Sequence, residues 1–147
     1  MKILIISPGK AHDSTVKEGI EVYEKRMSAH FDVTWAHPAA GNKESEGEAI
    51  LKLIKKDDQV ILLDERGKDI TTPGTAKLLE QAMVSGVKRL VFVIGGAFGV
   101  SEAVAKRANS TIKLSSLVFP HMLVRLILVE QLYRANSILT GGKYHHA

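Results

Sequence analysis

Short apolar segments alternate along the chain with segments that carry helix signals, and this alternation limits the fold more than any other feature of the sequence. Apolar or alternating patterns predict strands over 1–7, 31–36, 59–64, 89–94 and 111–114. Helices are predicted over 15–29, 45–56, 72–86, 101–108 and 120–139, the last opened by a proline and the others by N-caps at Thr15, Ser45, Thr72 and Ser101. This order of elements predicts an α/β fold with a mostly parallel sheet flanked by helices.

A chain of 147 residues without a linker, repeat or low-complexity segment predicts a single domain over 1–147. The chain has no cysteine, which removes disulfides, zinc–thiolate sites and thiolate nucleophiles, and which fits a reducing compartment. Its longest apolar stretch, 122–129, is interrupted by Arg125 and is far shorter than the roughly 18 residues that a membrane span needs. We therefore expect a soluble, cytoplasmic protein that does not associate with a membrane.

The formal net charge of +4 is unevenly distributed along the chain. Residues 1–73 carry 11 basic and 13 acidic side chains, whereas residues 74–147 carry 9 basic and 3 acidic ones. A positive field of this kind attracts polyanions, so RNA or DNA is a candidate partner of the second half. The alternative is that the surplus charge serves only solubility.

The carboxyl ends of parallel strands are where α/β proteins bind ligands, so the loops after residues 64, 94 and 114 are the candidate site. The loop Gly95–Gly99 has the spacing GGxxG and follows the fourth strand, whereas a dinucleotide fingerprint has GxGxxG after the first strand. No phosphate-binding GxxxxGK[ST] motif occurs. The glycines are therefore either structural or allow the backbone to approach a flat ligand.

No metal site is expected from the acidic and histidine pairs of the sequence. Asp64 and Glu65 follow the third strand, but they point to opposite faces if that strand continues through them. This segment is either a solvated turn or the wall of a ligand site. Adjacent His145 and His146 are poor joint ligands in an extended tail, and no third ligand is evident.

The last predicted helix is apolar on nearly all sides, which is typical of a helix buried in a large core or in a subunit interface. In a small domain the interface is the simpler explanation, so we expect a homodimer. Glu130 and Arg134 are spaced as a favourable i,i+4 ion pair. Arg125 lies half a turn away from Arg134, and we expect it to bind a carboxylate or carbonyl in that interface. Arg134 either complements the helix dipole or holds a phosphate or an anionic base.

The tail after Gly141–Gly142 ends in Tyr144-His145. A short terminal segment is commonly disordered. Alternatively, a tyrosine and a histidine beside a buried helix in the basic half are suitable groups to orient or deprotonate a substrate.

Several motifs, taken in order and spacing, closely resemble the RlmH family of SPOUT-class methyltransferases. The resemblance covers the whole chain and depends on these segments: Leu63-Asp64 before Gly67-Lys68, the stretch Val93–Gly99, Leu114–His121, Leu123–Arg125, Glu130–Ala135 and the closing Tyr144-His145.

The resemblance implies a homodimer whose C-terminal part forms a trefoil knot, and S-adenosyl-L-methionine as cofactor. It implies methylation of N3 of a pseudouridine in 23S ribosomal RNA, with the assembled ribosome or large subunit as partner. The implied cofactor-binding residues are Leu63, Gly95, Leu114, Ser115, Ser116, Leu117, Val118 and Phe119. The implied catalytic residues are Arg134 as anion stabiliser, Tyr144 as stacking or hydrogen-bonding partner and His145 as base or orienting group; no metal is required.

The missing cysteine also fits this chemistry, because methylation at a pyrimidine carbon commonly proceeds through a cysteine adduct, whereas a nitrogen acceptor needs only an exposed lone pair. Phe98, Met122 and His146 depart from the residues common in the family at these positions. Two alternatives remain at this stage: a non-catalytic ribosome-binding dimer, and a knotted methyltransferase that acts on a tRNA base.

Overall fold

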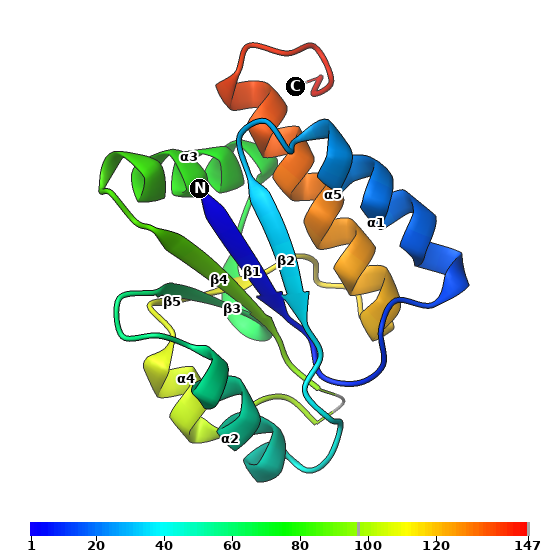
Figure 1. Cartoon of the computed structure of the whole chain (residues 1–147), viewed down its shortest axis with the longest axis vertical. Helices are drawn as coiled ribbons and strands as arrows, with labels where there is room; N and C mark the ends of the chain where they lie inside the picture. The colour runs from blue at the N-terminus through cyan, green and yellow to red at the C-terminus, as the bar shows by residue number, and fades with distance from the viewer. Residues whose placement is uncertain (97, 147) are drawn as a thin grey trace.

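The computed structural model describes residues 1–96 and 98–146, and over these residues five parallel strands form one sheet with helices on both faces (Figure 1). Ala97 of the glycine-rich loop and the terminal Ala147 lie outside the described residues. The elements follow the predicted order and are β1 (Lys2–Ile6), α1 (Ser14–Arg26), β2 (Asp32–Ala36), α2 (Lys43–Leu53), β3 (Gln59–Asp69), α3 (Thr72–Val84), β4 (Arg89–Ile94), α4 (Glu102–Arg107), β5 (Ser110–Lys113) and α5 (His121–Leu139).

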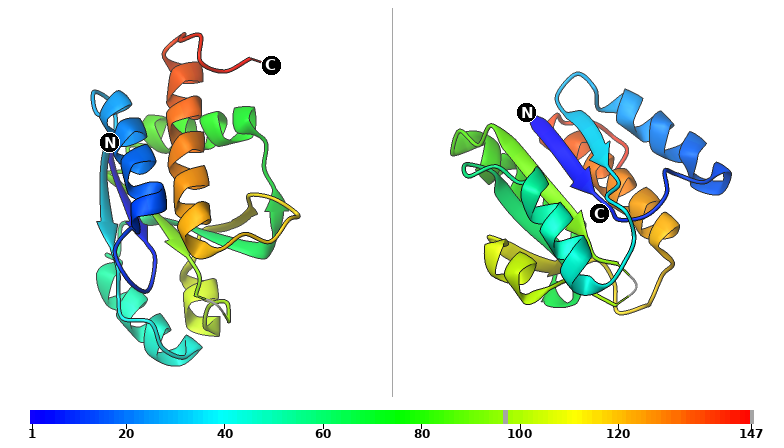
Figure 2. Two further views of the ribbon diagram at one scale, coloured as in Figure 1. Left: turned by 90° about the vertical axis from the view of Figure 1, so that its right-hand side faces the viewer. Right: turned by 60° about the horizontal axis from the view of Figure 1, so that its bottom comes forward.

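The strand order is β2-β1-β4-β3-β5, and every neighbouring pair is parallel. The continuous apolar run in β1 is explained by burial on both faces. Ile3 and Ile5 pack in one core with α1, α3 and α5, whereas Leu4 and Ile6 pack in a second core with α2 and α4. Figure 2 shows the two helical layers on opposite sides of the sheet. The predicted α/β class is therefore confirmed; the knot stays a prediction.

Helices α1 and α2 begin earlier than predicted, because a better cap lies upstream in each case, and α3 begins at the predicted residue with a different cap. The side chain of Asp13 caps α1 by accepting from the Thr15 N–H (3.1 Å), and that of Asn42 caps α2 by accepting from the Ser45 N–H (2.8 Å). Thr71 caps α3 in place of Thr72. Aspartate and asparagine are among the best N-caps, which explains why they replace the predicted threonine and serine. Ser101 caps α4 as predicted.

Strand β3 is longer than predicted and contains a register shift against β5 between Leu63 and Lys68. The strand bends there, and Gly67 lies directly against the backbone of β5. A Cβ at Gly67 would lie 2.7 Å from the carbonyl carbon of Ile112, so only glycine permits this pairing.

Helix α5 lies between α1 and α3 and buries Leu128, Val129, Leu132 and Ala135 within its own chain (Figure 1). The chain itself therefore covers much of this helix, and the expected homodimer stays a prediction. Part of the helix, including Met122 and Leu126, remains only half-buried. Within the described part of the chain, no helix is long and apolar enough to cross a membrane.

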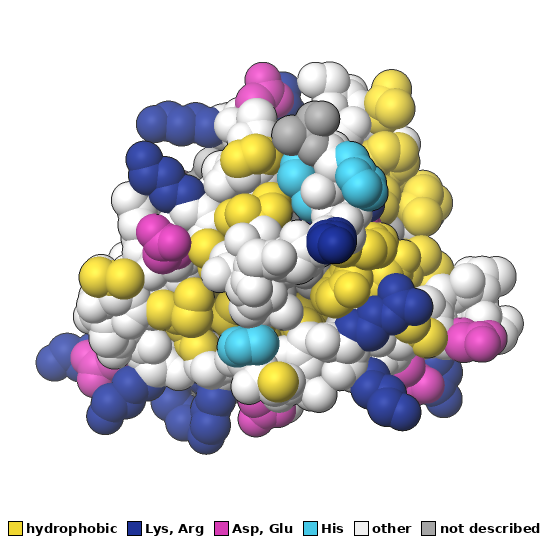
Figure 3. All heavy atoms as spheres, turned by 90° about the horizontal axis from the view of Figure 1, so that it is seen from above, with side chains coloured by type: hydrophobic (Ala, Val, Ile, Leu, Met, Phe, Trp, Pro, Cys, Tyr) yellow, Lys and Arg dark blue, Asp and Glu magenta, His cyan; other side chains and the backbone are white. Residues whose placement is uncertain are grey.

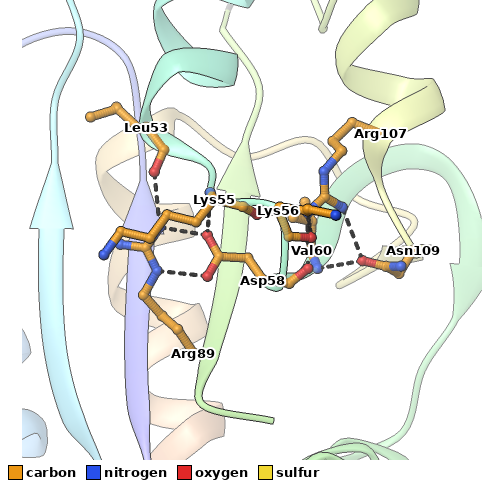
Figure 4. Close-up of polar contacts among 8 residues, drawn as sticks. All are labelled: Leu53, Lys55, Lys56, Asp58, Val60, Arg89, Arg107 and Asn109. Atoms are coloured by element: carbon orange, nitrogen blue, oxygen red, sulfur yellow. Dashed lines mark hydrogen bonds and ion pairs between the residues drawn. The ribbon is translucent and has the colours of Figure 1, made fainter.

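A polar network fixes the amino-terminal ends of β3 and β4 (Figure 4). Arg89 donates to the carboxylate of Asp58 through Nε (2.9 Å), and Arg107 donates to the carbonyl of Asp58 (2.9 Å). Burial raises the pKa of Asp58, but hydrogen bonds from Arg89 and from the Lys55 N–H outweigh it and bring the pKa below its usual range. Asn109 accepts from the Val60 N–H (2.8 Å). The opposite, carboxyl edge of the sheet carries the cleft described next.

Candidate active site

A cleft of about 950 Å³ lies at the carboxyl edge of the sheet, between residues 63–66 of β3, the loops after β4 and β5, and the first turn of α5. Its floor is apolar and buried, with Leu63, Ile94 and Val100. Its rim carries Phe98 and Val118, which are 78% and 88% exposed. The volume and the apolar floor are typical of sites for small organic molecules.

The cleft brings together nearly all the residues that the sequence predicted to bind a cofactor. Leu63 beside the register shift of β3, Gly95 directly after β4 and the loop after β5 line it from three neighbouring strands of the parallel sheet. The predicted residues in its wall are Leu63, Gly95, Leu114, Ser115, Leu117, Val118 and Phe119; Ser116 is not part of the wall. Their role in binding remains a prediction.

The loop 115–120 belongs to no helix or strand, so its backbone groups are not committed to a ladder. Ser115 Oγ accepts from the Leu117 N–H (2.9 Å), which holds the loop in a tight turn. Polar backbone groups in such a loop bond to water or to a ligand. The loop therefore offers donors and acceptors beside an apolar floor.

The glycine-rich loop after β4 depends on its glycines for close packing. A Cβ at Gly95 would lie 3.0 Å from Cγ1 of Val100, and one at Gly96 would clash with the carboxylate of Glu46. Gly99 has a φ of +84°, which favours glycine. The glycines are therefore required by the packing and conformation of the loop. Gly95 and Gly96 also line the cleft.

Asp64 and Arg66 at the cleft mouth are paired with each other. Asp64 accepts from the Arg66 backbone N–H (2.8 Å) and side-chain Nε (3.1 Å). These hydrogen bonds from Arg66 hold the pKa of Asp64 below its usual range, so the carboxylate is ionised at neutral pH. Glu65 is exposed while Asp64 is half-buried, in line with the predicted divergence. Among residues 1–96 and 98–146, no group of three or more His, Cys, Asp or Glu could hold a metal ion.

Sequence reasoning missed several residues of the cleft, because it assigned them no chemistry. Val100, Ser101, Lys113 and Val124 line it. Their positions in the sequence could have identified them, because they lie directly after the glycine-rich loop, at the end of β5 and in the first turn of α5. They extend the site toward α4 and α5.

Buried Arg125 connects α5 to the end of β1. It is 1% exposed, and its Nε donates to Ser7 Oγ (2.8 Å) while Nη2 lies 3.4 Å from the Ser7 carbonyl. The prediction that Arg125 binds a group in a subunit interface is therefore wrong, because its partners are the hydroxyl and the carbonyl of Ser7 in the same chain. Nη1 lies 3.3 Å from Nδ1 of His12. Burial, and next the charge of Arg125, lower the pKa of His12 to about 4, which leaves the ring neutral and able to accept.

Arg134, Tyr144 and His145, the predicted catalytic residues, come together at the C-terminal end of α5. The guanidinium carbon of Arg134 lies 4.6 Å from the centre of the Tyr144 ring. Its Nη1 lies 3.4 Å from His145 Nδ1, and its Nε donates to Glu130 Oε1 (2.8 Å). The predicted Glu130–Arg134 pair is thus confirmed.

Glu130 organises this C-terminal cluster of Glu130, Arg134, Tyr144 and His145. Its Oε1 also accepts from the Tyr144 hydroxyl (3.1 Å). A hydrogen bond with Tyr23, then burial, then the charge of Glu130 raise the pKa of Tyr144 well above its ordinary value. The phenol is therefore a neutral donor to the Glu130 carboxylate.

The cleft and the C-terminal cluster do not meet within one chain. His121 lines the cleft at the start of α5, whereas Arg134 lies 13 residues further along, which is about 20 Å at 1.5 Å per residue. Figure 1 shows the C-terminal tail at the opposite end of the sheet from the strand arrowheads, and the left view of Figure 2 agrees. The sequence predicted the two sets of residues but not the distance that the helix between them imposes.

The fold and the site together define an α/β protein with an open parallel sheet and a ligand-sized cleft at the carboxyl edge of that sheet, beside a long terminal helix. A family model described as "Predicted SPOUT methyltransferase" matches residues 1–145. Because this match covers nearly the whole chain, the chain belongs to the SPOUT methyltransferase family.

Full-length relatives agree with this family. The chain is 42% identical to a protein of Flavobacterium johnsoniae named ribosomal RNA large subunit methyltransferase H, with 99% of each chain covered. It is 37% identical to a protein of the same name from Geotalea daltonii, covering 99% of this chain and 100% of that one. A third, from Clostridium botulinum, is 40% identical with 99% of each covered. The resemblance to the RlmH family drawn from the motifs is thereby confirmed.

Proposed function

We propose that this protein uses S-adenosyl-L-methionine to methylate N3 of a pseudouridine in 23S ribosomal RNA, on assembled ribosomes or large subunits. The proposal depends chiefly on the cleft. The residues predicted to bind the cofactor line it, and the chain belongs to the SPOUT family. The names of the full-length relatives support ribosomal RNA of the large subunit as the substrate. The proposal places the protein in the cytoplasm and calls for no metal and no membrane.

The residues of the cleft fit the proposed cofactor. The adenosine part of the molecule has apolar faces and polar edges, which matches an apolar floor beside an uncommitted backbone loop. Leu63 and Leu114 would contact the faces, and backbone groups of the loop 115–119 would bond to the edges. Gly95 lets the backbone of β4 come close. When bound, the cofactor supplies an electrophilic methyl group on its sulfonium sulfur.

The residues of the C-terminal cluster fit the acceptor. N3 of the pseudouridine must lose its proton, because its lone pair is otherwise delocalised, and it then gains the methyl group. His145 would take the proton, and Arg134 would stabilise the charge that develops on the ring. Tyr144, held neutral, would donate a hydrogen bond to a ring carbonyl or stack on the base. As the bond between N3 and the methyl carbon forms, the bond between that carbon and sulfur breaks. The negative charge of the deprotonated ring and the positive charge of the sulfonium cancel, and the proton stays on His145.

A homodimer brings the two sets of residues together. Within one chain they lie at opposite ends of α5, so a complete site requires the cleft of one protomer and the C-terminal cluster of its partner. Apolar rim residues such as Leu117, which is 71% exposed, and the half-buried side chains of α5 supply surface for such an interface. The dimer is proposed on this ground.

The test is mass spectrometry of nucleosides from large-subunit RNA of a strain that lacks the gene, combined with methyl transfer by the purified protein to ribosomes, large subunits and tRNA. We expect loss of a methylated pseudouridine in the strain and transfer to ribosomes or large subunits in vitro. Transfer to tRNA alone would establish the tRNA alternative. Ribosome binding without cofactor binding in calorimetry would establish the non-catalytic alternative.

A further inference from the structure

Three tyrosine rings lie in contact beside the C-terminal cluster, and they come from three distant parts of the chain. Tyr133 on α5 is central, with its ring centre 5.6 Å from that of Tyr23 on α1 and 4.6 Å from that of Tyr144 in the tail. The planes of the Tyr23 and Tyr133 rings are tilted by 30° to each other. All three side chains are only partly buried.

An arginine covers the outer side of two of these rings. The guanidinium carbon of Arg26, in the last turn of α1, lies 5.7 Å from the ring centre of Tyr23 and 5.8 Å from that of Tyr133. Arg26 is exposed, and within residues 1–96 and 98–146 it forms no ion pair. Figure 3, which views this end of the molecule, shows Lys and Arg side chains beside apolar surface near the tail.

Nearby carboxylates are already engaged with other partners. Glu24 accepts from Trp35 Nε1 (2.8 Å), and Glu130 accepts from Arg134 and Tyr144. The charge of Arg26 is therefore available to an external anion. Partly exposed tyrosine rings beside a guanidinium without an ion pair are a combination that can bind single-stranded nucleic acid, because every base has a face that stacks and every nucleotide has a phosphate.

We propose that Tyr23, Tyr133 and Arg26 form a stacking platform for an unpaired RNA nucleotide next to the one that is methylated. The base stacks on the tyrosine rings, and Arg26 stacks on its other face or binds its phosphate. Tyr133 touches Tyr144 directly, so the platform holds a nucleotide adjacent to the one at the C-terminal cluster. This inference rests on the proposed function, because that function supplies the RNA.

The experiment compares Tyr133→Leu, Tyr133→Phe and Arg26→Gln with the wild type, using co-sedimentation with large subunits for affinity and methyl transfer for KM and kcat. Leucine keeps apolar bulk but removes the aromatic face, whereas phenylalanine keeps the face. We expect Tyr133→Leu to weaken binding and raise KM about five- to 150-fold, as for loss of one base–aromatic stack, and Tyr133→Phe to retain wild-type values. Arg26→Gln should weaken binding more than Lys25→Gln, which removes an exposed charge from the same helix turn without touching a ring.

Each result either supports or overturns the platform. Unchanged KM and affinity in Tyr133→Leu, with thermal unfolding like that of the wild type, would overturn it while leaving the methyltransferase function intact. A shift of Tyr133→Leu from dimer to monomer in sedimentation would also overturn it, by assigning this face to a second copy of the chain. If the wild type transfers no methyl group, co-sedimentation still decides: equal binding by all variants overturns the platform, and the predicted order of affinities supports it.

Discussion

The carboxylate of Glu130 accepts a hydrogen bond of 3.1 Å from the hydroxyl of Tyr144, fourteen residues further along the chain. The same oxygen accepts from Arg134 Nε (2.8 Å), so one carboxylate holds both the guanidinium and the tail. The tail is thereby folded back onto α5 and is not a free end. Glu130 is therefore a positioning residue for the groups proposed to act on the RNA base.

Glu130→Gln should impair methyl transfer more than it destabilises the protein. The amide accepts hydrogen bonds more weakly than the carboxylate and does not neutralise Arg134, so we expect kcat to fall by about tenfold, equivalent to roughly 1.4 kcal/mol. The free energy of unfolding should fall by only about 0.5–1 kcal/mol, as for a partly exposed pair. Enzyme assays and urea unfolding measure the two. Glu80→Gln, the same change at an exposed position on α3, is the control and should alter neither.

Mixed dimers test whether the cleft and the C-terminal cluster act across subunits. Gly95→Val should abolish cofactor binding and Arg134→Ala should abolish catalysis, so each homodimer is inactive. After random reassociation, about half of the dimers are mixed and each has one complete site, which should restore about a quarter of wild-type activity. Calorimetry and thermal unfolding check that only the intended function is lost. A mixture as inactive as its components, with mixed dimers verified by mass spectrometry, would rule out the shared site.

Val118→Asp should weaken the dimer, because it places a charge on an apolar rim residue that is 88% exposed in the single chain. Its folding should be unaffected, since the side chain contributes little to the core. Sedimentation at micromolar concentration should show a shift toward monomer relative to the wild type. A wild type that is already monomeric at that concentration would remove the basis for both this expectation and the shared site.

Arg125→Met should lower the free energy of unfolding by about 1–3 kcal/mol, because the buried Ser7 hydroxyl loses its donor. Ser7→Ala introduced into that variant should recover part of the loss, since it removes the unpaired group. Urea unfolding of the two single variants and the double variant gives the coupling between them. Strictly additive changes would mean that the Arg125–Ser7 contact contributes nothing to stability.

Acidification should destabilise the protein partly through His12. Its pKa is about 4 in the folded chain, chiefly because burial disfavours the charged ring, against 6.5 for the ordinary side chain. The unfolded chain therefore binds the proton more tightly, so this contribution to stability is fully present above about pH 6.5 and is lost as the pH falls toward 4. His12→Gln keeps an acceptor for Arg125 but does not titrate. Its urea midpoint should fall less than that of the wild type between pH 7 and pH 4.5, and parallel curves would contradict this assignment.

Local patterns in the sequence were sufficient to place all the strands and helices, because burial on both faces of a parallel sheet produces continuous apolar runs such as 89–94. They also identified the cleft, because parallel strands bring their carboxyl ends to one edge. The N-caps were less predictable: Asp13 and Asn42 compete with nearby hydroxyl residues, and the backbone hydrogen bonds that decide between them form only in the folded chain.

The sequence by itself determined the α/β class, the segments that line the cleft and the group Arg134, Tyr144 and His145, because each depends on short-range pattern or on family motifs. Only the tertiary structure decided that Arg125 is satisfied inside its own chain, because α5 had to be placed between α1 and α3 before its neighbours were known. It also decided that the cleft and the C-terminal cluster lie apart. A rigid helix keeps its two ends separated by its length. No pattern of residue types shows whether a second subunit places its own C-terminal cluster beside the cleft of the first.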